Sequence, residues 1–444
     1  MQTKRENKQG RLVLLPPVEQ FIPSDHRLRR LHRALDLSFV HEMVRDKYCQ
    51  DNGRPSVDPE VVVRLFLLQA IEGIGQVREL LRQVQVNLAY RWFIGYELDE
   101  EIPDHSTLSK ALDRFGEAVF NQVFVRSIAQ CQQSGLIEGK VLHVDATTIR
   151  ADIDRDRVNQ AKSSDPDARY GHFPGGDLEP GYKQQTVVDD RSRVIVGLDV
   201  VSADRLEGHS MVSVVDSATE HLGFAPEVVC ADAGYGSGEN RAEFESRGVR
   251  LVSPPKKVQL LEGGKYFTVA DFIYDESRDV FVCPSGSLLR NVGGVLGRPK
   301  VRQYAAMRSV CRRCQLKARC TKSSRRQLKV SLHYGALHRL RADSRTESFR
   351  ALYRRRAPVI EGIFAEAKQW HGLHRAWRRG LSKMRIQCLL IAAVLNFKRL
   401  VASLSPLFGF KETLSTLVNA IGRIPGIIRR FCRGILIEDE LQLA

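Results

Sequence analysis

The positions of two aspartates in the sequence suit metal-dependent phosphate chemistry. Asp145 follows the apolar run of residues 141–144, and Asp232 follows the apolar run of residues 228–231. A carboxylate that closes an apolar strand lies at the edge of the sheet, where α/β folds bind ligands. Two such carboxylates on adjacent strands repel each other unless a cation lies between them, and Mg²⁺ prefers oxygen ligands. The pair therefore forms a candidate metal site.

A third carboxylate belongs to the same pattern. Glu361 lies early in a predicted helix over residues 358–370, and Lys368 follows two turns later on the same helix face. These groups would place three acidic side chains around one or two metal ions, with a cation beside them. A single aspartate at a strand end is more often a turn or capping residue, so the prediction depends on the three acids together.

The elements that must position these groups predict a mixed α/β sheet. The predicted strands cover residues 141–145, 182–188, 193–200, 227–232 and 249–253, and the helices among them cover residues 212–221 and 240–247. Asp189–Ser192 is a hairpin signal between the second and third strands. Strands that are followed by alternating helix and strand indicate such a sheet. A further apolar helix is expected over residues 382–400, with Ser382 as its N-cap.

The region before the sheet is predicted to be helical. Asp58 is expected to cap a helix that has Pro59 at its first position, and Ser106 is expected to cap another. Residues 1–36 are polar, basic and proline-containing, and we expect an extended arm there.

Four cysteines gather after the sheet, at Cys283, Cys311, Cys314 and Cys320. Four thiols that include a local Cys-x-x-Cys suit a tetrahedral structural Zn²⁺ site, and reduced free thiols are the alternative. The surrounding segment is rich in basic residues and poor in large apolar ones, so we expect metal to supply part of its folding energy.

The charge of the chain points to a polyanionic partner. Its 444 residues include 68 Lys and Arg against 52 Asp and Glu, a formal net charge of +16. No acidic residue occurs from Phe281 to Ala342, and a long stretch of one sign is typical of an interaction surface. We expect DNA as the partner, with Arg312 and Arg313 among its contacts.

No run approaches the roughly 20 apolar residues that span a bilayer, and no secretory signal follows the polar N-terminus. A cytoplasmic, nucleoid-associated protein without a membrane partner is therefore expected.

The motifs around the three acids resemble those of DDE transposases from bacterial insertion sequences, which have an RNase H-like core and, in this branch, an InsH-type N-terminal domain. The first two motifs are His143-Val-Asp145-Ala-Thr-Thr-Ile149 and Ala231-Asp232-Ala-Gly-Tyr235. The third runs from Tyr353 through Arg356 and Glu361 to Lys368. Four residues, in place of the usual three, separate Arg356 from Glu361, which leaves Arg354 and Arg355 as alternatives. The similarity extends from about residue 40 to 400 and includes residues 53–57, 103–107 and 379–381.

The resemblance implies a function and a role for each motif residue. Mg²⁺ or Mn²⁺ held by Asp145, Asp232 and Glu361 would support cleavage at the ends of a mobile element and joining of those ends to target DNA. Lys368 would contact a phosphate near the cut, Tyr353 would stack on or bond to the end nucleotide, and Arg356 would bind the DNA backbone. The expected partners are terminal inverted repeats, target DNA and further copies of the chain, as a homodimer or higher oligomer.

Two other functions remain open at this point. A metal-dependent DNA endonuclease without strand transfer needs the same carboxylates. A catalytically inactive, transposase-derived DNA-binding protein would retain the basic surface alone.

The predicted organisation has six segments. These are an N-terminal arm (1–36), a helical DNA-binding domain of InsH type (37–135), a first part of an RNase H-like core (136–253), a Cys-rich basic insertion (254–344), a second part of the core with the glutamate helix (345–404) and a helical tail (405–444).

Overall fold

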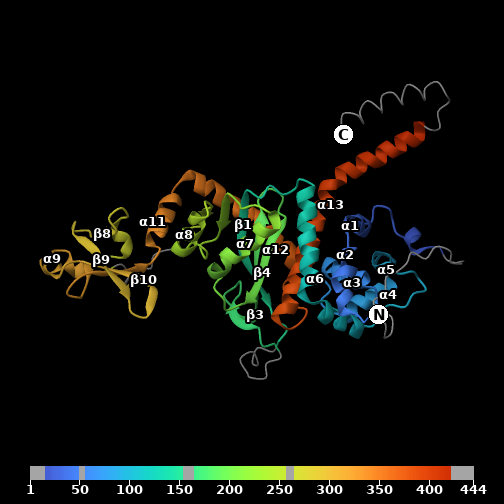
Figure 1. Cartoon of the computed structure of the whole chain (residues 1–444), viewed down its shortest axis with the longest axis horizontal. Helices are drawn as coiled ribbons and strands as arrows, with labels where there is room; N and C mark the ends of the chain where they lie inside the picture. The colour runs from blue at the N-terminus through green and yellow to red at the C-terminus, as the bar shows by residue number, and fades with distance from the viewer. Residues whose placement is uncertain (1–15, 50–55, 154–164, 257–264, 422–444) are drawn as a thin grey trace.

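Three parts follow one another along the long axis of the molecule (Figure 1). A group of helices forms one end, a mixed sheet with its covering helices forms the middle, and a small antiparallel sheet forms the other end. The computed structural model describes residues 16–49, 56–153, 165–256 and 265–421, with side chains up to residue 404.

The N-terminal part is helical almost throughout. Its elements are η1 (Val18–Phe21), α1 (Arg27–Ala34), α2 (Phe39–Val44), η2 (Arg45–Lys47), α3 (Pro59–Glu72), α4 (Val77–Val86), α5 (Leu88–Ile94) and α6 (His105–Gln133). The predicted start of α3 is confirmed, because the Asp58 side chain accepts from the backbone N–H of Glu60 and Pro59 occupies the first helical position.

Two local predictions in this part are wrong. The cap of α6 is Asp104, whose Oδ1 accepts from the N–H of Ser106 at 2.8 Å, and Ser106 lies inside the helix. The described part of the predicted arm is not extended either. Arg27–Ala34 forms α1, because Leu28 and Leu31 lie on one helical face and bury against the core.

The middle part is the mixed sheet predicted from the sequence. Its strands are β1 (Val141–Arg150), β2 (Arg169–His172), β3 (Leu178–Asp189), β4 (Ile195–Ser202), β5 (Val228–Ala231) and β6 (Arg250–Val252). The order is β2-β3-β1-β5-β6, and β4 pairs with β3. The central strand β1 is antiparallel to β3 and parallel to β5. With its covering helices, this is an RNase H-like α/β architecture.

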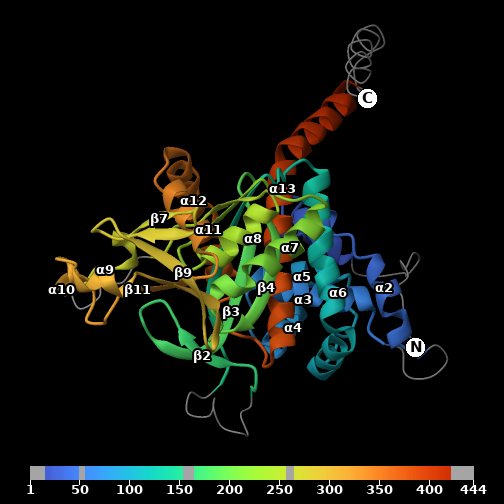
Figure 2. The ribbon, with the colours of Figure 1, turned by 60° about the vertical axis from the view of Figure 1, so that its left-hand side comes forward.

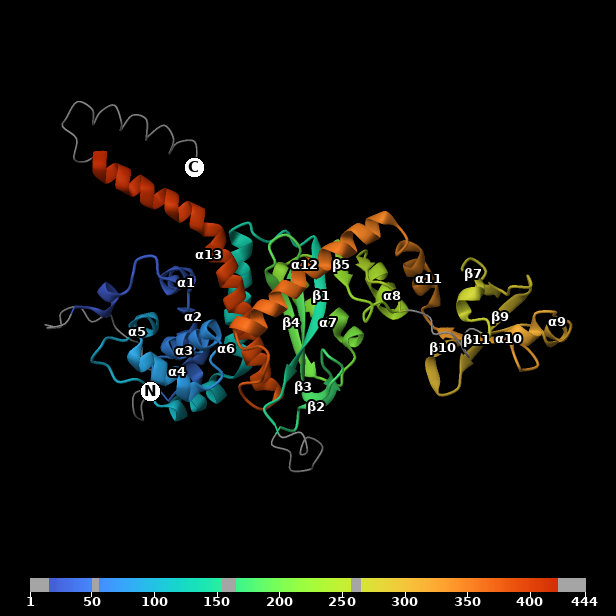
Figure 3. The same cartoon turned by 180° about the vertical axis from the view of Figure 1, so that it is seen from behind.

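Helices cover both faces of this sheet. The elements are η4 (Glu207–Ser210), α7 (Met211–Leu222), α8 (Gly238–Ser246), α12 (Glu347–Trp370) and α13 (Leu381–Ile421). Seen from opposite sides, α7 lies over one face and α12 over the other (Figures 1 and 3). α12 contacts β1, β5 and β6, whereas α13 contacts β4 and the N-terminal helices α3 and α6.

α13 is the central helix of the protein. Leu381–Leu404 is long and apolar enough to cross a membrane, which the sequence prediction overlooked, but 72% of its apolar window is buried inside the protein. The buried Asn396 fastens it to the sheet, since its amide donates to the C=O of Ile195 and accepts from the N–H of the same residue, both at 2.8 Å. One continuous hydrophobic cluster therefore joins the N-terminal helices to the mixed sheet.

The small sheet has an apolar core of its own. Its elements are η6 (Val269–Asp271), β7 (Ile273–Asp275), β8 (Val280–Val282), β9 (Leu288–Val295), β10 (Arg298–Ala305), α9 (Arg308–Arg312), α10 (Lys317–Cys320) and β11 (Gln327–Ser331), followed by α11 (Tyr334–Asp343). The strand order is β11-β10-β9-β8-β7, and Figure 2 brings this sheet forward. Phe281, Tyr304 and Tyr334 pack ring against ring at its centre.

Candidate active site

The sheet register places the two candidate aspartates side by side. The parallel pairing of β1 with β5 ends at Val144 opposite Ala231, so the next residue on each strand is Asp145 or Asp232. β1 does not end at Asp145, as the sequence suggested, but continues to Arg150 because β3 pairs with it along this whole length. Asp145 therefore lies on a continuous strand, beside the point where β5 ends.

Asp145 is held from both sides. Its Oδ1 accepts from the N–H of Ala146 at 2.8 Å, and its Oδ2 accepts from Nη1 of Arg356 at 2.6 Å. Burial raises the pKa of Asp145, the Arg356 guanidinium opposes that rise, and the nearby charge of Asp232 adds to it. Asp232 in turn accepts from the N–H of Gly234 at 2.8 Å.

The guanidinium on Asp145 settles which arginine of the third motif reaches the aspartates. Arg356 does so, with its guanidinium 5.8 Å from the Tyr353 ring. Arg354 pairs with Glu347, and Arg355 pairs with Asp190.

The third motif lies on one long helix. The Thr346 side chain caps α12, and Pro358 lies inside the helix, whereas the sequence suggested a start at Pro358. Pro358 is tolerated because it lies on the exposed side of the helix, where solvent can serve the carbonyl that loses its partner. Tyr353, Arg356 and Lys368 therefore have a fixed spacing along a single helix.

Glu361 is not brought to the two aspartates. Five residues of helix rotate its direction by about 140° from that of Arg356, and its side chain is exposed, with no hydrogen bond or ion pair among the described residues. Within the described ranges, no group of three or more His, Cys, Asp or Glu side chains is arranged to hold a metal ion. Lys368 is half-buried further along α12, and burial, followed by the charge of Arg150, lowers its pKa.

A buried histidine network behind Asp145 escaped the sequence analysis. His143 Nε2 lies 2.8 Å from Asp190 Oδ1, and Asp190 also binds Arg355 of α12. Burial lowers the pKa of His143, and Asp190 opposes that effect. Alternate residues of a strand share a face, so the His-x-Asp spacing of His143 and Asp145 was an available signal. Arg355 and Arg356 together fasten α12 to this part of the sheet.

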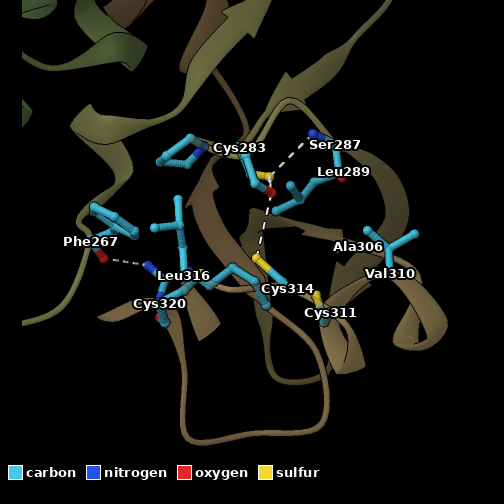
Figure 4. A pocket seen from close by; sticks show the side chains of 13 residues that line it. Phe267, Cys283, Ser287, Leu289, Ala306, Val310, Cys311, Cys314, Leu316 and Cys320 are labelled. Carbon is cyan, nitrogen blue, oxygen red and sulfur yellow. Dashed lines mark hydrogen bonds between the residues drawn. The ribbon is translucent and has the colours of Figure 1, made fainter. Parts of the chain in front are cut away.

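The four cysteines do meet, but the structure does not support the zinc site. Cys283, Cys311, Cys314 and Cys320 line one small pocket (Figure 4). Two of the thiols are engaged with a serine: Cys283 Sγ lies 3.1 Å and Cys314 Sγ 3.6 Å from Ser285 Oγ. That metal supplies part of the folding energy stays a prediction, although the segment also has an aromatic core of its own, which the sequence analysis did not anticipate.

The remaining sites of the sequence prediction lie far from the aspartates. Arg312 and Arg313 are exposed at the end of α9 in the small sheet. Neither has an ion-pair partner in the part of the chain that the structure describes.

Two segments of the chain match known protein families. Residues 16–114 match the family described as Transposase domain (DUF772), and residues 282–401 match the Transposase DDE domain. The chain therefore carries two transposase domains, one of which is a DDE domain. The second match begins at the end of β8 and includes β9, β10, β11 and α12. Members of the DDE transposase family use divalent metal ions.

The solved structures that are similar to this chain are transposases. One is a piggyBac transposase synaptic complex with hairpin DNA, at 10% identity and a TM-score of 0.32, covering 93% of this chain and 82% of that one. Another is a Mos1 transposase paired-end complex with the left transposon end, at 9% identity and a TM-score of 0.18, covering 46% of this chain and 61% of that one. No curated protein matches the sequence.

Proposed function

We propose that this protein is a DNA transposase that cleaves the ends of an insertion sequence and joins them to target DNA. The observation that carries the proposal is the register of β1 and β5, which sets Asp145 beside Asp232 in a chain with two transposase domains. The proposed partners are terminal inverted repeats, target DNA and further copies of the chain, in the nucleoid of the cytoplasm.

The donor set fits a hard divalent cation. Asp145 and Asp232 present carboxylate oxygens at one edge of the sheet. Asp145 already pairs with one cation, because the Arg356 guanidinium donates to its Oδ2. Asp145 and Asp232 would hold Mg²⁺ or Mn²⁺, and Glu361 is the proposed third ligand. The metal would supply an activated water or 3′-hydroxyl and stabilise the leaving oxygen.

The residues of α12 would bind and orient the DNA end. Arg356, once released from Asp145, carries a guanidinium that can bind a phosphate in two places. Tyr353 is half-buried beside it and offers a ring face to a terminal base, and Lys368 is a cation further along the helix. These three residues would thus position the DNA strand against Asp145 and Asp232.

A joining assay tests the function. The gene's flanking DNA would be searched for inverted repeats, and a labelled duplex ending in that repeat would be incubated with the full chain, Mg²⁺ and a supercoiled plasmid. Labelled plasmid is the expected result. Cleavage without joining would indicate the endonuclease, and binding without cleavage would indicate the inactive DNA-binding protein.

The small sheet is proposed to carry much of the DNA affinity. Replacing Arg312 and Arg313 by Ala should lower the slope of log Kd against log salt by about one to two units, because each phosphate contact releases about one counterion. Fluorescence anisotropy of a labelled duplex over a salt series measures this slope. Replacement of the exposed Arg30 and Arg33 in α1 serves as a charge-matched control, and an unchanged slope in the Arg312/Arg313 variant would place the contacts elsewhere.

A further inference from the structure

A fourth carboxylate lies beside the two aspartates, on an element that none of the three family motifs includes. Glu207 begins η4, the short helix between β4 and α7. A methyl carbon built on Gly234 would lie 2.9 Å from Oδ1 of Asp232 and 3.3 Å from Oε2 of Glu207. The two carboxylates are therefore so close that a single carbon atom would touch both, and Gly234 leaves that space open.

The position of Glu207 is fixed by packing on both sides. The buried Asn240 amide donates to the C=O of Gly208 at 3.1 Å and to the C=O of Tyr235 at 3.0 Å. It thereby ties η4 to the loop that follows Asp232. From the sheet, Gln185 Nε2 donates to the backbone C=O of Glu207 at 3.0 Å. Such bonds from rigid elements hold a side chain in place better than a free loop would.

A buried hydroxyl without a partner points to a missing ligand. Tyr235 is 0% exposed, and its hydroxyl has no hydrogen-bond partner among the residues that the structure describes. Burial raises the pKa of Tyr235 well above its usual value, and the charges of Glu207, Asp145 and Asp232 raise it further. The charges of three carboxylates thus act on one unsatisfied donor, and buried polar groups usually have a partner.

Glu207 and Asp145 are each paired with a side-chain cation. Lys183 Nζ lies 3.1 Å from Oε1 of Glu207, just as Arg356 holds Asp145. With these cations in place, the three acids are not arranged as a metal site in the described residues. A divalent cation beside Asp232 competes with Lys183 for Glu207, because its double charge attracts a carboxylate more strongly than an ammonium does.

On the basis of the proposed function, we propose that Glu207 is a further metal-binding carboxylate of this centre, sharing a divalent cation with Asp232. The Tyr235 hydroxyl then donates to a carboxylate or to a water on that cation. The centre would thus draw ligands from η4 as well as from β1, β5 and α12.

The test measures Mn²⁺ binding to the full chain without DNA, by electron paramagnetic resonance of the free ion. Glu207→Gln should raise the Kd for Mn²⁺ at least about tenfold. Asp204→Asn, an exposed acid on the same loop, should leave the Kd unchanged, and the melting temperature of both variants checks folding. Lys183→Met should lower the Kd several-fold, and the Lys183→Met/Glu207→Gln double variant should lose that gain.

The outcomes separate this inference from the proposed function. An unchanged Kd in Glu207→Gln, or a gain in Lys183→Met that survives in the double variant, overturns the role of Glu207. If Asp145→Asn still weakens Mn²⁺ binding in that case, the proposed function stands. If the wild-type chain binds no Mn²⁺, both proposals fail.

Discussion

Replacing either Asp145 or Asp232 by Asn is expected to abolish cleavage of the DNA end, with a loss of at least about 10³ in rate. The amide keeps the shape of the side chain but loses the charge that binds the metal. DNA affinity should be unchanged, because the exposed basic residues that would bind phosphates lie in other parts of the molecule. Single-turnover cleavage of a labelled end with Mg²⁺, together with anisotropy for binding, measures both quantities.

Glu361 gives the sharper version of this experiment, because its carboxylate does not reach the aspartates in the DNA-free chain. Glu361→Gln is expected to lose a similar factor in rate, since DNA binding must bring the glutamate and the aspartates together. Glu347→Gln, an exposed acid on the same helix, is the matched control and should cleave normally. Near wild-type cleavage by Glu361→Gln would remove this residue from the set of metal ligands.

Arg356→Gln should change metal binding and cleavage in opposite directions. Without the guanidinium at 2.6 Å from Asp145 Oδ2, a divalent cation no longer competes with a bound positive charge. The Kd for Mn²⁺ of the DNA-free chain should fall about tenfold, which corresponds to about 1.4 kcal/mol. Cleavage should fall about 10²-fold, because the DNA end loses a charged phosphate contact.

The neighbouring arginine provides the control for this experiment. Arg354→Gln removes the same charge from α12 at a position that pairs with Glu347 and not with Asp145, so its Mn²⁺ affinity should stay at the wild-type value. A weaker Mn²⁺ affinity in Arg356→Gln, or cleavage at the wild-type rate, would contradict the displacement of Arg356 by metal and its transfer to DNA.

The sequence predicted those features that depend on local pattern. Apolar runs ending at Asp145 and Asp232 identified two strands, and the cap at Asp58 identified the start of α3. Where an element depends on distant packing, local pattern failed. Pro358 signals a helix start when only its missing N–H is considered, but the buried faces of α12 on both sides of it continue the helix.

The sequence likewise predicted only part of the candidate site. Parallel strand pairing follows from the α/β pattern, so the meeting of Asp145 with Asp232 could be anticipated. The rotation of Glu361 away from Arg356 follows from their five-residue spacing on a helix and was an available signal. The approach of Glu207 depends on the packing of η4 on the Gly234 loop and leaves no signal in the spacing of residues. The aromatic core of the small sheet could not be predicted either, because it is assembled from residues spread between Phe272 and Tyr334.

The late position of α13 affects when a newly made chain can first act. Its Asn396 amide reaches back 269 residues to Ser127 of α6 and 201 residues to Ile195 of β4. While the ribosome is still reading the codons for α13, the apolar surfaces of α3, α6 and β4 that pack on this helix stay uncovered. A chain that stalls or ends early therefore cannot close its core, and long-range closure of this kind is slow. Synthesis of α13 is therefore a condition for completing the core that positions Asp145 and Asp232.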